Sequence, residues 1–141
     1  MLNKVQNRRG GFTLVEIMIV VAIIALLAAI AVPSALRARK RSQASSTLET
    51  LRVLDSACDQ WAIETGQKPS ASPTAATLAK YVKTGSTIYT QLVAGSAKDA
   101  LGTALTLPAV DVQPQLSSGS FNALSDVADT DFWGSYYNFG S

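Results

Sequence analysis

The sequence contains no histidine, and Cys58 is its only cysteine. A single cysteine excludes a disulfide within the chain, and the lack of histidine excludes the common Cys/His zinc sites. Without histidine, a serine or cysteine nucleophile also lacks its usual general base. We therefore predict that the protein is not an enzyme and uses no cofactor.

Charge is sparse as well, and it is unevenly distributed. The net charge is +2, but Lys4, Arg8 and Arg9 all stand before the first acidic residue. From Phe12 onward the chain has slightly more acidic than basic residues. The basic balance therefore belongs to the first few residues, and it predicts no nucleic-acid partner.

One long apolar run, residues 12–32, is what the sequence does contain, and Pro33 ends it. As an α-helix this run would extend about 30 Å, the hydrocarbon thickness of a bilayer. Glu16 is its only ionisable side chain. Because an unpaired charge in lipid is costly and usually functional, we expect Glu16 to meet a partner from outside the run.

Two interpretations of this run are incomplete. A secretory signal peptide accounts for the basic start and for the small-x-small sequence at residues 29–31, but its apolar region is shorter and holds no carboxylate. A plain membrane anchor fits the length and leaves Glu16 unexplained.

Thr13 and Glu16 also have the spacing of a capping box, with Phe12 and Ile17 as its hydrophobic staple. This local role is compatible with a partner in another chain.

A third interpretation accounts for all of these features. The sequence Gly11-Phe12-Thr13-Leu14-Val15-Glu16 resembles the processing site of type IV prepilins and of type II secretion pseudopilins. The resemblance implies a basic leader, residues 1–11, that a prepilin peptidase removes by cutting between Gly11 and Phe12. It also implies N-methylation of Phe12 and pairing of its new amine with Glu16 of a neighbouring subunit.

The resemblance further implies a function. It indicates a structural subunit of a type IV pilus or of a type II secretion pseudopilus. Such a subunit crosses the bacterial inner membrane once, with its N-terminus in the cytoplasm, and later enters a periplasmic or extracellular filament. Its expected partners are further copies or other pilin-like subunits, the prepilin peptidase and methylase, an inner-membrane assembly platform and membrane lipid. The alternative is a monomeric membrane-anchored binding protein that uses an aromatic, acidic C-terminal surface.

We predict one long helix, beginning at Thr13, in two halves. Residues 12–32 form a membrane or filament-core half, and Pro33, placed where this family has a helix-bending proline, is with Glu16 an expected assembly residue. Residues 33–66 form an amphipathic half that Gly66 caps. Apolar residues at intervals of three and four mark the buried face of this second half: Ala44, Leu48, Leu51, Leu54, Cys58, Trp61 and Ala62.

A basic cluster follows the apolar run and comprises Arg37, Arg39, Lys40 and Arg41. It outnumbers the basic residues of the leader, so the distribution of charge alone does not place the N-terminus in the cytoplasm. At the outer face of the membrane the cluster would contact lipid headgroups or acidic residues of neighbouring subunits. The other interpretation is a solvated helix face.

Residues 67–141 are predicted to form a small globular head. This makes the fold class α+β and type IV pilin-like, with the long helix packed on a small antiparallel sheet. A short helix is expected from Ser72 to about Lys83. The expected strands, chosen for their β-branched and alternating residues, are 87–93 and 103–110, with a turn at 98–102 between them and a further strand or turn pair within 132–139.

The C-terminal tail carries two groups of candidate residues. The carboxylates of Asp126, Asp129 and Asp131 lie close enough in the sequence for a calcium site, although aspartate is also common in turns. The second group is aromatic and forms either a subunit interface or, as we favour, part of the core of the head. Its members are Phe132, Trp133, Tyr136, Tyr137 and Phe139.

Overall fold

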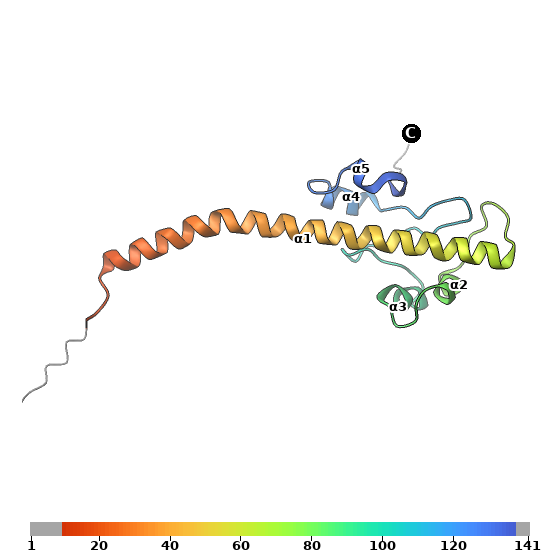
Figure 1. The fold of residues 1–141 in the computed structure, drawn as a ribbon, viewed down its shortest axis with the longest axis horizontal. Helices are drawn as coiled ribbons and strands as arrows, with labels where there is room; N and C mark the ends of the chain where they lie inside the picture. The colour runs from red at the N-terminus through yellow and green to blue at the C-terminus, as the bar shows by residue number, and fades with distance from the viewer. Residues whose placement is uncertain (1–9, 138–141) are drawn as a thin grey trace, which may run out of the picture. The chain divides into compact units, whose positions relative to one another are not determined.

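The computed structural model describes residues 10–137, and its regular elements are all helices (Figure 1). The chain divides into two compact units, residues 1–36 and residues 37–141, and each is described by itself. In chain order the elements are α1 (Leu14–Thr65), α2 (Ala75–Leu78), the 3-10 helix η1 (Ala79–Tyr81), α3 (Thr87–Val93), α4 (Ser118–Leu124), α5 (Thr130–Trp133) and the 3-10 helix η2 (Gly134–Tyr136).

Helix α1 has the extent that the sequence predicts. It begins one residue after Thr13 and continues through Pro33 without a break in the helical assignment. At its C-terminus Gly66 takes the left-handed conformation, with φ of +63°. The Gln67 N–H then donates to the Ala62 carbonyl at 3.1 Å, which is the six-to-one bond of a Schellman cap. The expected glycine cap is therefore confirmed.

The predicted antiparallel-sheet head is wrong, because residues 10–137 contain no β-strand and are mostly helical. The clearest example is residues 87–93, which form α3. Ser86 caps this helix, since its hydroxyl accepts the Tyr89 N–H at 3.1 Å. Ile88 and Leu92 stand four residues apart and turn towards the core. Capping and helical spacing therefore outweigh the β-propensity of the threonines and isoleucine.

The second predicted strand, residues 103–110, is also wrong, because it forms no ladder. Only isolated antiparallel bridges occur here, Lys98 with Ala104 and Ala109 with Val112. Pro108 is fully buried within this stretch and has no N–H to donate, so it interrupts any continuous pairing. The turn at residues 98–102 does form as expected.

Of two smaller expectations, one is met in part and the other is wrong. The helix expected from Ser72 begins later, because Thr74 is the residue that caps it, and it is divided between α2 and η1. The strand or turn pair expected within residues 132–139 is replaced by α5 and η2, as far as Tyr137. Phe139 lies outside the described residues.

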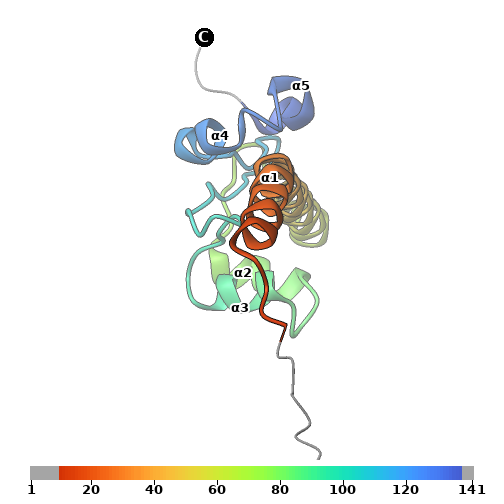
Figure 2. The same ribbon diagram turned by 90° about the vertical axis from the view of Figure 1, so that its left-hand side faces the viewer.

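The core of the head is built on the buried face of the second half of α1. Figures 1 and 2 show α2 and α3 on one side of this half and α4 and α5 on the other. Of the predicted stripe, Trp61 and Ala62 are half-buried and the rest is buried. Each fully buried leucine contributes about 1.5–3 kcal/mol. The leucines and the tryptophan that complete the core are Leu78, Leu92, Leu105, Leu116, Leu124 and Trp133.

Candidate functional site

The N-terminal part of α1 has an apolar surface on all sides. Every residue from Gly10 to Arg39 is exposed, including Leu14 at 79% and Ile30 at 71%. The mean hydropathy of this stretch reaches 3.0, and the helix is long and apolar enough to cross a membrane. A helix that is apolar all round requires an apolar environment, either lipid or other apolar helices.

A capping box begins this helix, as the sequence predicts. The Glu16 N–H donates to Thr13 Oγ1 at 3.2 Å, and the Thr13 N–H donates to Glu16 Oε2 at 2.7 Å. The Thr13 hydroxyl donates to the same Oε2 at 3.0 Å. Both bonds to the carboxylate therefore use Oε2, and Oε1 accepts no hydrogen bond from any residue between 10 and 137. Glu16 is positioned by its own chain and keeps one oxygen open.

The Gly11–Phe12 bond lies in exposed, non-helical chain just before α1. A Cβ atom added to Gly10 or Gly11 would meet no atom within 4 Å, and neither residue has a left-handed φ. By contrast, Gly66 and Gly102 have φ values of +63° and +85°, which only glycine adopts freely. The fold therefore requires the later glycines but not Gly10 and Gly11.

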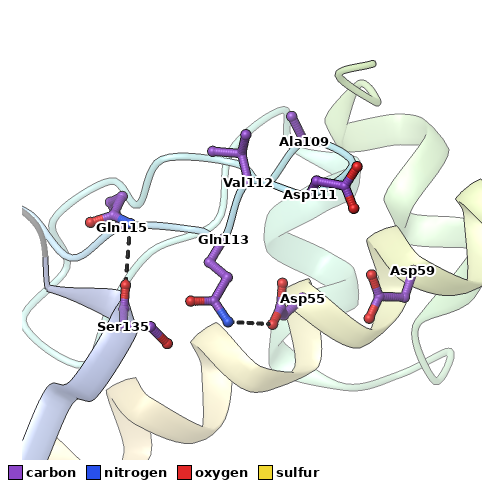
Figure 3. Close-up of a pocket in the computed structure, with 8 residues that line it drawn as sticks. All are labelled: Asp55, Asp59, Ala109, Asp111, Val112, Gln113, Gln115 and Ser135. Atoms are coloured by element: carbon purple, nitrogen blue, oxygen red, sulfur yellow. Dashed lines mark hydrogen bonds between the residues drawn. The ribbon is translucent and has the colours of Figure 1, made fainter. Parts of the chain in front are cut away.

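An acidic pocket, defined by Asp55, Asp59 and Asp111, lies beside α1 in the head (Figure 3). Its volume is about 490 Å³. Asp55 Oδ2 accepts the Gln113 amide at 3.5 Å and the Tyr136 hydroxyl at 3.3 Å. The sequence alone did not predict this pocket. One sequence feature could have indicated the pocket, namely that Asp55 and Asp59 stand four residues apart on one side of a helix. Asp111 lies on a loop that is distant in the sequence, so no pattern connects it with them.

The electrostatics of the pocket are unfavourable for the isolated chain. Burial raises the pKa of Asp55, and the neighbouring Asp59 carboxylate raises it further, against the opposing effect of the two hydrogen bonds. The folded pKa thus lies above the unfolded one. Ionised Asp55 therefore weakens the folded state at neutral pH, and this loss is relieved as the pH falls through the raised pKa.

Asp55→Asn is accordingly expected to raise the free energy of unfolding at pH 7 by up to about 0.5 kcal/mol, because it removes the repulsion and keeps an acceptor for Tyr136. The gain should disappear near about pH 3, where the parent carboxylate is protonated as well. Urea unfolding of the full chain in detergent micelles at both pH values measures this. Asp59→Asn is the matched control, because it removes the same repulsion and leaves the hydrogen bonds of Asp55 in place. A loss of more than about 1 kcal/mol at pH 7 would show that Asp55 is held mainly by its hydrogen bonds.

The three carboxylates of the C-terminal tail have separate structural roles. Both oxygens of Asp126 accept from Lys40 Nζ at 3.0 Å, and this bond lowers the pKa of Asp126. Asp129 caps α5 by accepting the Phe132 N–H at 3.0 Å, and Asp131 stands in the first turn of that helix. Within residues 10–137 no group of three or more acidic or cysteine side chains converges as metal ligands.

The aromatic residues of the tail lie in or against the core. Trp133 is 1% exposed, and the Phe132 ring meets it edge-on at 5.0 Å between centroids. Tyr136 packs against the core with its hydroxyl on Asp55, and Tyr137 stacks on Phe121 at 4.3 Å. This placement favours the core interpretation over an exposed interface.

Cys58 lies in the same core. It is 2% exposed, and burial raises the pKa of its thiol. A buried thiol with a raised pKa is unreactive, which fits a structural residue.

The comparisons with known proteins concern the N-terminal segment. Residues 6–32 match the family model of the prokaryotic N-terminal methylation motif. No curated protein and no solved structure matches the chain significantly. The match covers the Gly11–Phe12 bond, the capping box and most of the exposed apolar helix. Residues 6–32 are therefore the prepilin-type cleavage and methylation segment that marks type IV pilin-like and pseudopilin-like precursors.

Proposed function

We propose that this protein is a structural subunit of a type IV filament, either a pilus or a type II secretion pseudopilus. The observation that carries the proposal is the methylation motif at residues 6–32 continuing into a helix that is apolar and exposed on all sides. Such a surface requires lipid around the stored precursor and apolar neighbours around the assembled subunit. One segment thus serves first as a membrane anchor and later as a filament core.

The local geometry supports processing between Gly11 and Phe12. The bond is exposed and precedes the helix, so a peptidase can bind it in an extended form. Because the fold does not require glycine at positions 10 and 11, the two glycines serve a molecule that binds the segment. We assign that role to the prepilin peptidase, which faces the cytoplasm and therefore requires a cytoplasmic N-terminus.

The geometry also supports a role for Glu16 in assembly. Cleavage creates an α-amino group at Phe12, a cation that the precursor lacks. Glu16 presents its open Oε1 at the same end of the helix. Pairing between the carboxylate of one subunit and the amine of the next offsets the cost of a charge in an apolar environment and fixes the axial register. The capping box survives cleavage, because the Thr13 N–H that it uses lies beyond the new terminus.

The alternative function, a monomeric anchored binding protein, loses its main support. It relied on the aromatic, acidic tail as a contact surface. Trp133 is instead buried, Asp126 is paired with Lys40, and Asp129 caps α5. Most of these side chains of the tail therefore make contacts within the head.

The decisive experiment is the intact mass of the protein recovered from membranes of cells with an active prepilin peptidase, with fragmentation of its N-terminus. We expect a chain that begins at N-methylated Phe12. A chain that still begins at Met1 would reject the filament proposal in favour of the plain anchor. A start near Val32 would indicate a secreted head released by signal peptidase.

A further inference from the structure

One side of α1 carries a pair of basic residues and, further along the helix, a pair of acidic residues. Arg37 and Arg41 form the first pair, and Asp55 and Asp59 form the second. The members of each pair are four residues apart, and each aspartate follows its arginine by 18 residues. Eighteen residues make five full turns of an α-helix, or about 27 Å. The basic pair and the acidic pair therefore repeat the same pattern on the same side of the helix.

None of these four residues forms an ion pair within residues 10–137, although Arg37 lies near enough to Asp126 to help lower its pKa. The one ion pair among residues 10–137 joins Lys40 to Asp126. Asp59 and Arg41 are both exposed, and Asp111 adds a third carboxylate to the pocket (Figure 3). Arg52 lies one turn before Asp55 on α1 and makes no ion pair with it. The acidic pocket thus holds concentrated negative charge and open volume without a cation.

The chemistry of the pocket favours a basic side chain over a metal ion. A divalent cation needs several oxygens that converge at bonding distance, and these carboxylates do not converge in that way. Asp55 Oδ2 is moreover engaged by Gln113 and Tyr136. A guanidinium on a long flexible stem needs only space and opposite charge, and its fork of donors bridges separated carboxylates.

We propose that the acidic pocket receives Arg37 and Arg41 from a second copy of this chain, displaced along the helix axis by about 27 Å and turned about that axis so that its arginines face the pocket. The inference rests on the proposed filament function. Because both pairs have the same spacing, one displacement makes both contacts at once, whereas a displacement that differs by one helical turn brings only one of the two arginines to the pocket.

This contact has an open-ended geometry. Each copy directs its arginines to one neighbour and offers its pocket to another, so the contact propagates into a filament and does not close into a dimer. It also acts outside the apolar helix bundle, where the Glu16 pairing cannot reach. The basic pair and the acidic pocket would therefore fix the register of the heads, as Glu16 fixes that of the apolar helices.

A charge swap tests the proposal, using the full-length chain in peptidase-competent cells. Arg41→Asp alone or Asp59→Arg alone should lower the sedimentable filament fraction by about fivefold or more, because each places like charges together. The double variant should recover most of the parent yield. Arg39→Asp combined with Asp59→Arg is the matched control, because Arg39 lies on another side of α1, and it should not recover. Since Arg39, Arg41 and Asp59 are exposed, we expect the head to fold in every variant, which circular dichroism checks.

Cross-linking gives a second test that does not depend on charge. In a Cys58→Ala background, Arg41→Cys with Asp59→Cys should give a ladder of covalent multimers with a short bis-maleimide. A link within one chain is excluded, because the two sites lie about 27 Å apart. Arg39→Cys with Asp59→Cys should give no more than background.

The outcomes separate this contact from the proposed function. If the parent is processed and assembles but the swap does not recover and no ladder forms, the contact is rejected and the filament function stands. If the parent is neither processed nor sedimentable, both are rejected. If Ca²⁺ stabilises the parent and Asp59→Asn abolishes that effect, the pocket is a cation site and the contact is rejected.

Discussion

Glu16→Ala is expected to lower filament assembly by about 100-fold or more while leaving membrane insertion and cleavage intact. The apolar helix becomes still more apolar in this variant, so it inserts. The Gly11–Phe12 bond remains in exposed, non-helical chain. What is lost is the carboxylate that pairs with the Phe12 amine, and an amine left unpaired among apolar helices opposes assembly.

Two companion variants separate the pairing of Glu16 from its capping role. Glu16→Gln keeps an oxygen for the Thr13 N–H but carries no charge, so we expect it to fail almost as completely as alanine. Thr13→Val removes the hydroxyl that accepts the Glu16 N–H and keeps the charge. Because losing one cap costs about 0.5–2 kcal/mol of helix stability, Thr13→Val should assemble within about tenfold of the parent.

The measurement is the filament fraction sheared from cells, quantified against total processed subunit by N-terminal mass spectrometry. The processed total serves as the control for insertion and cleavage. If Glu16→Gln assembles as well as the parent, capping is the whole role of Glu16, and the intersubunit pair has to be abandoned.

The features that the sequence predicted correctly are those that local signals determine. The capping box depends on two residues three apart, and the C-terminal cap depends on Gly66 alone, so both ends of α1 were readable. The buried stripe of α1 follows from helical spacing. The cleavage segment is likewise a short contiguous motif, which is why the family model finds it without the rest of the chain.

The head was predicted poorly because its structure depends on distant contacts. The seven residues of α3 contain a helical spacing and a strand-like composition at once, and Ser86 with the core decides between them. The acidic pocket brings Asp111 to Asp55 and Asp59 from more than fifty residues away. No sequence pattern connects such positions, so the pocket and its cluster of carboxylates could be identified only from the folded chain.

Asp99 illustrates the same dependence on distant contacts and leads to the second large prediction. Its side chain is 5% exposed and accepts three hydrogen bonds. Oδ1 accepts the N–H groups of Leu101 at 2.9 Å and Thr103 at 2.7 Å, and Oδ2 accepts the Ser120 hydroxyl at the start of α4. One carboxylate therefore closes the turn at residues 98–102 and ties it to α4.

The same turn is also attached to α1. Thr47 is fully buried on that helix, and its hydroxyl oxygen accepts the Ala100 N–H at 3.1 Å. The turn thus connects the long helix with the C-terminal helices through side chains that are all buried from water. A hydrogen bond to a charged group contributes about 1.5–3 kcal/mol, so a carboxylate that accepts several such bonds contributes strongly to the stability of the head.

Asp99→Ala is therefore expected to destabilise the head by about 3–5 kcal/mol, since it removes three hydrogen bonds to a buried carboxylate. A small domain has only about 5–15 kcal/mol in total, so the head should be largely unfolded at a urea concentration that the parent tolerates. Ser120→Ala removes one of the three bonds and should cost about 1–2 kcal/mol. Urea unfolding of the full chain in micelles, followed by tryptophan fluorescence, measures this, because Trp133 is buried in the head.

The control for Asp99→Ala is the identity of the first residue of the recovered variant, determined by mass spectrometry. Under the proposed function, cleavage and methylation act at Gly11 and Phe12, before α1 and far from Asp99 in the sequence, so the variant should still begin at N-methylated Phe12. A loss of less than about 1 kcal/mol would mean that the apolar neighbours of the turn, Ala97 and Leu105, hold it without the carboxylate. The expected result, a processed subunit with an unstable head, would show that the processing segment and the polar network of the head are independent parts of one chain.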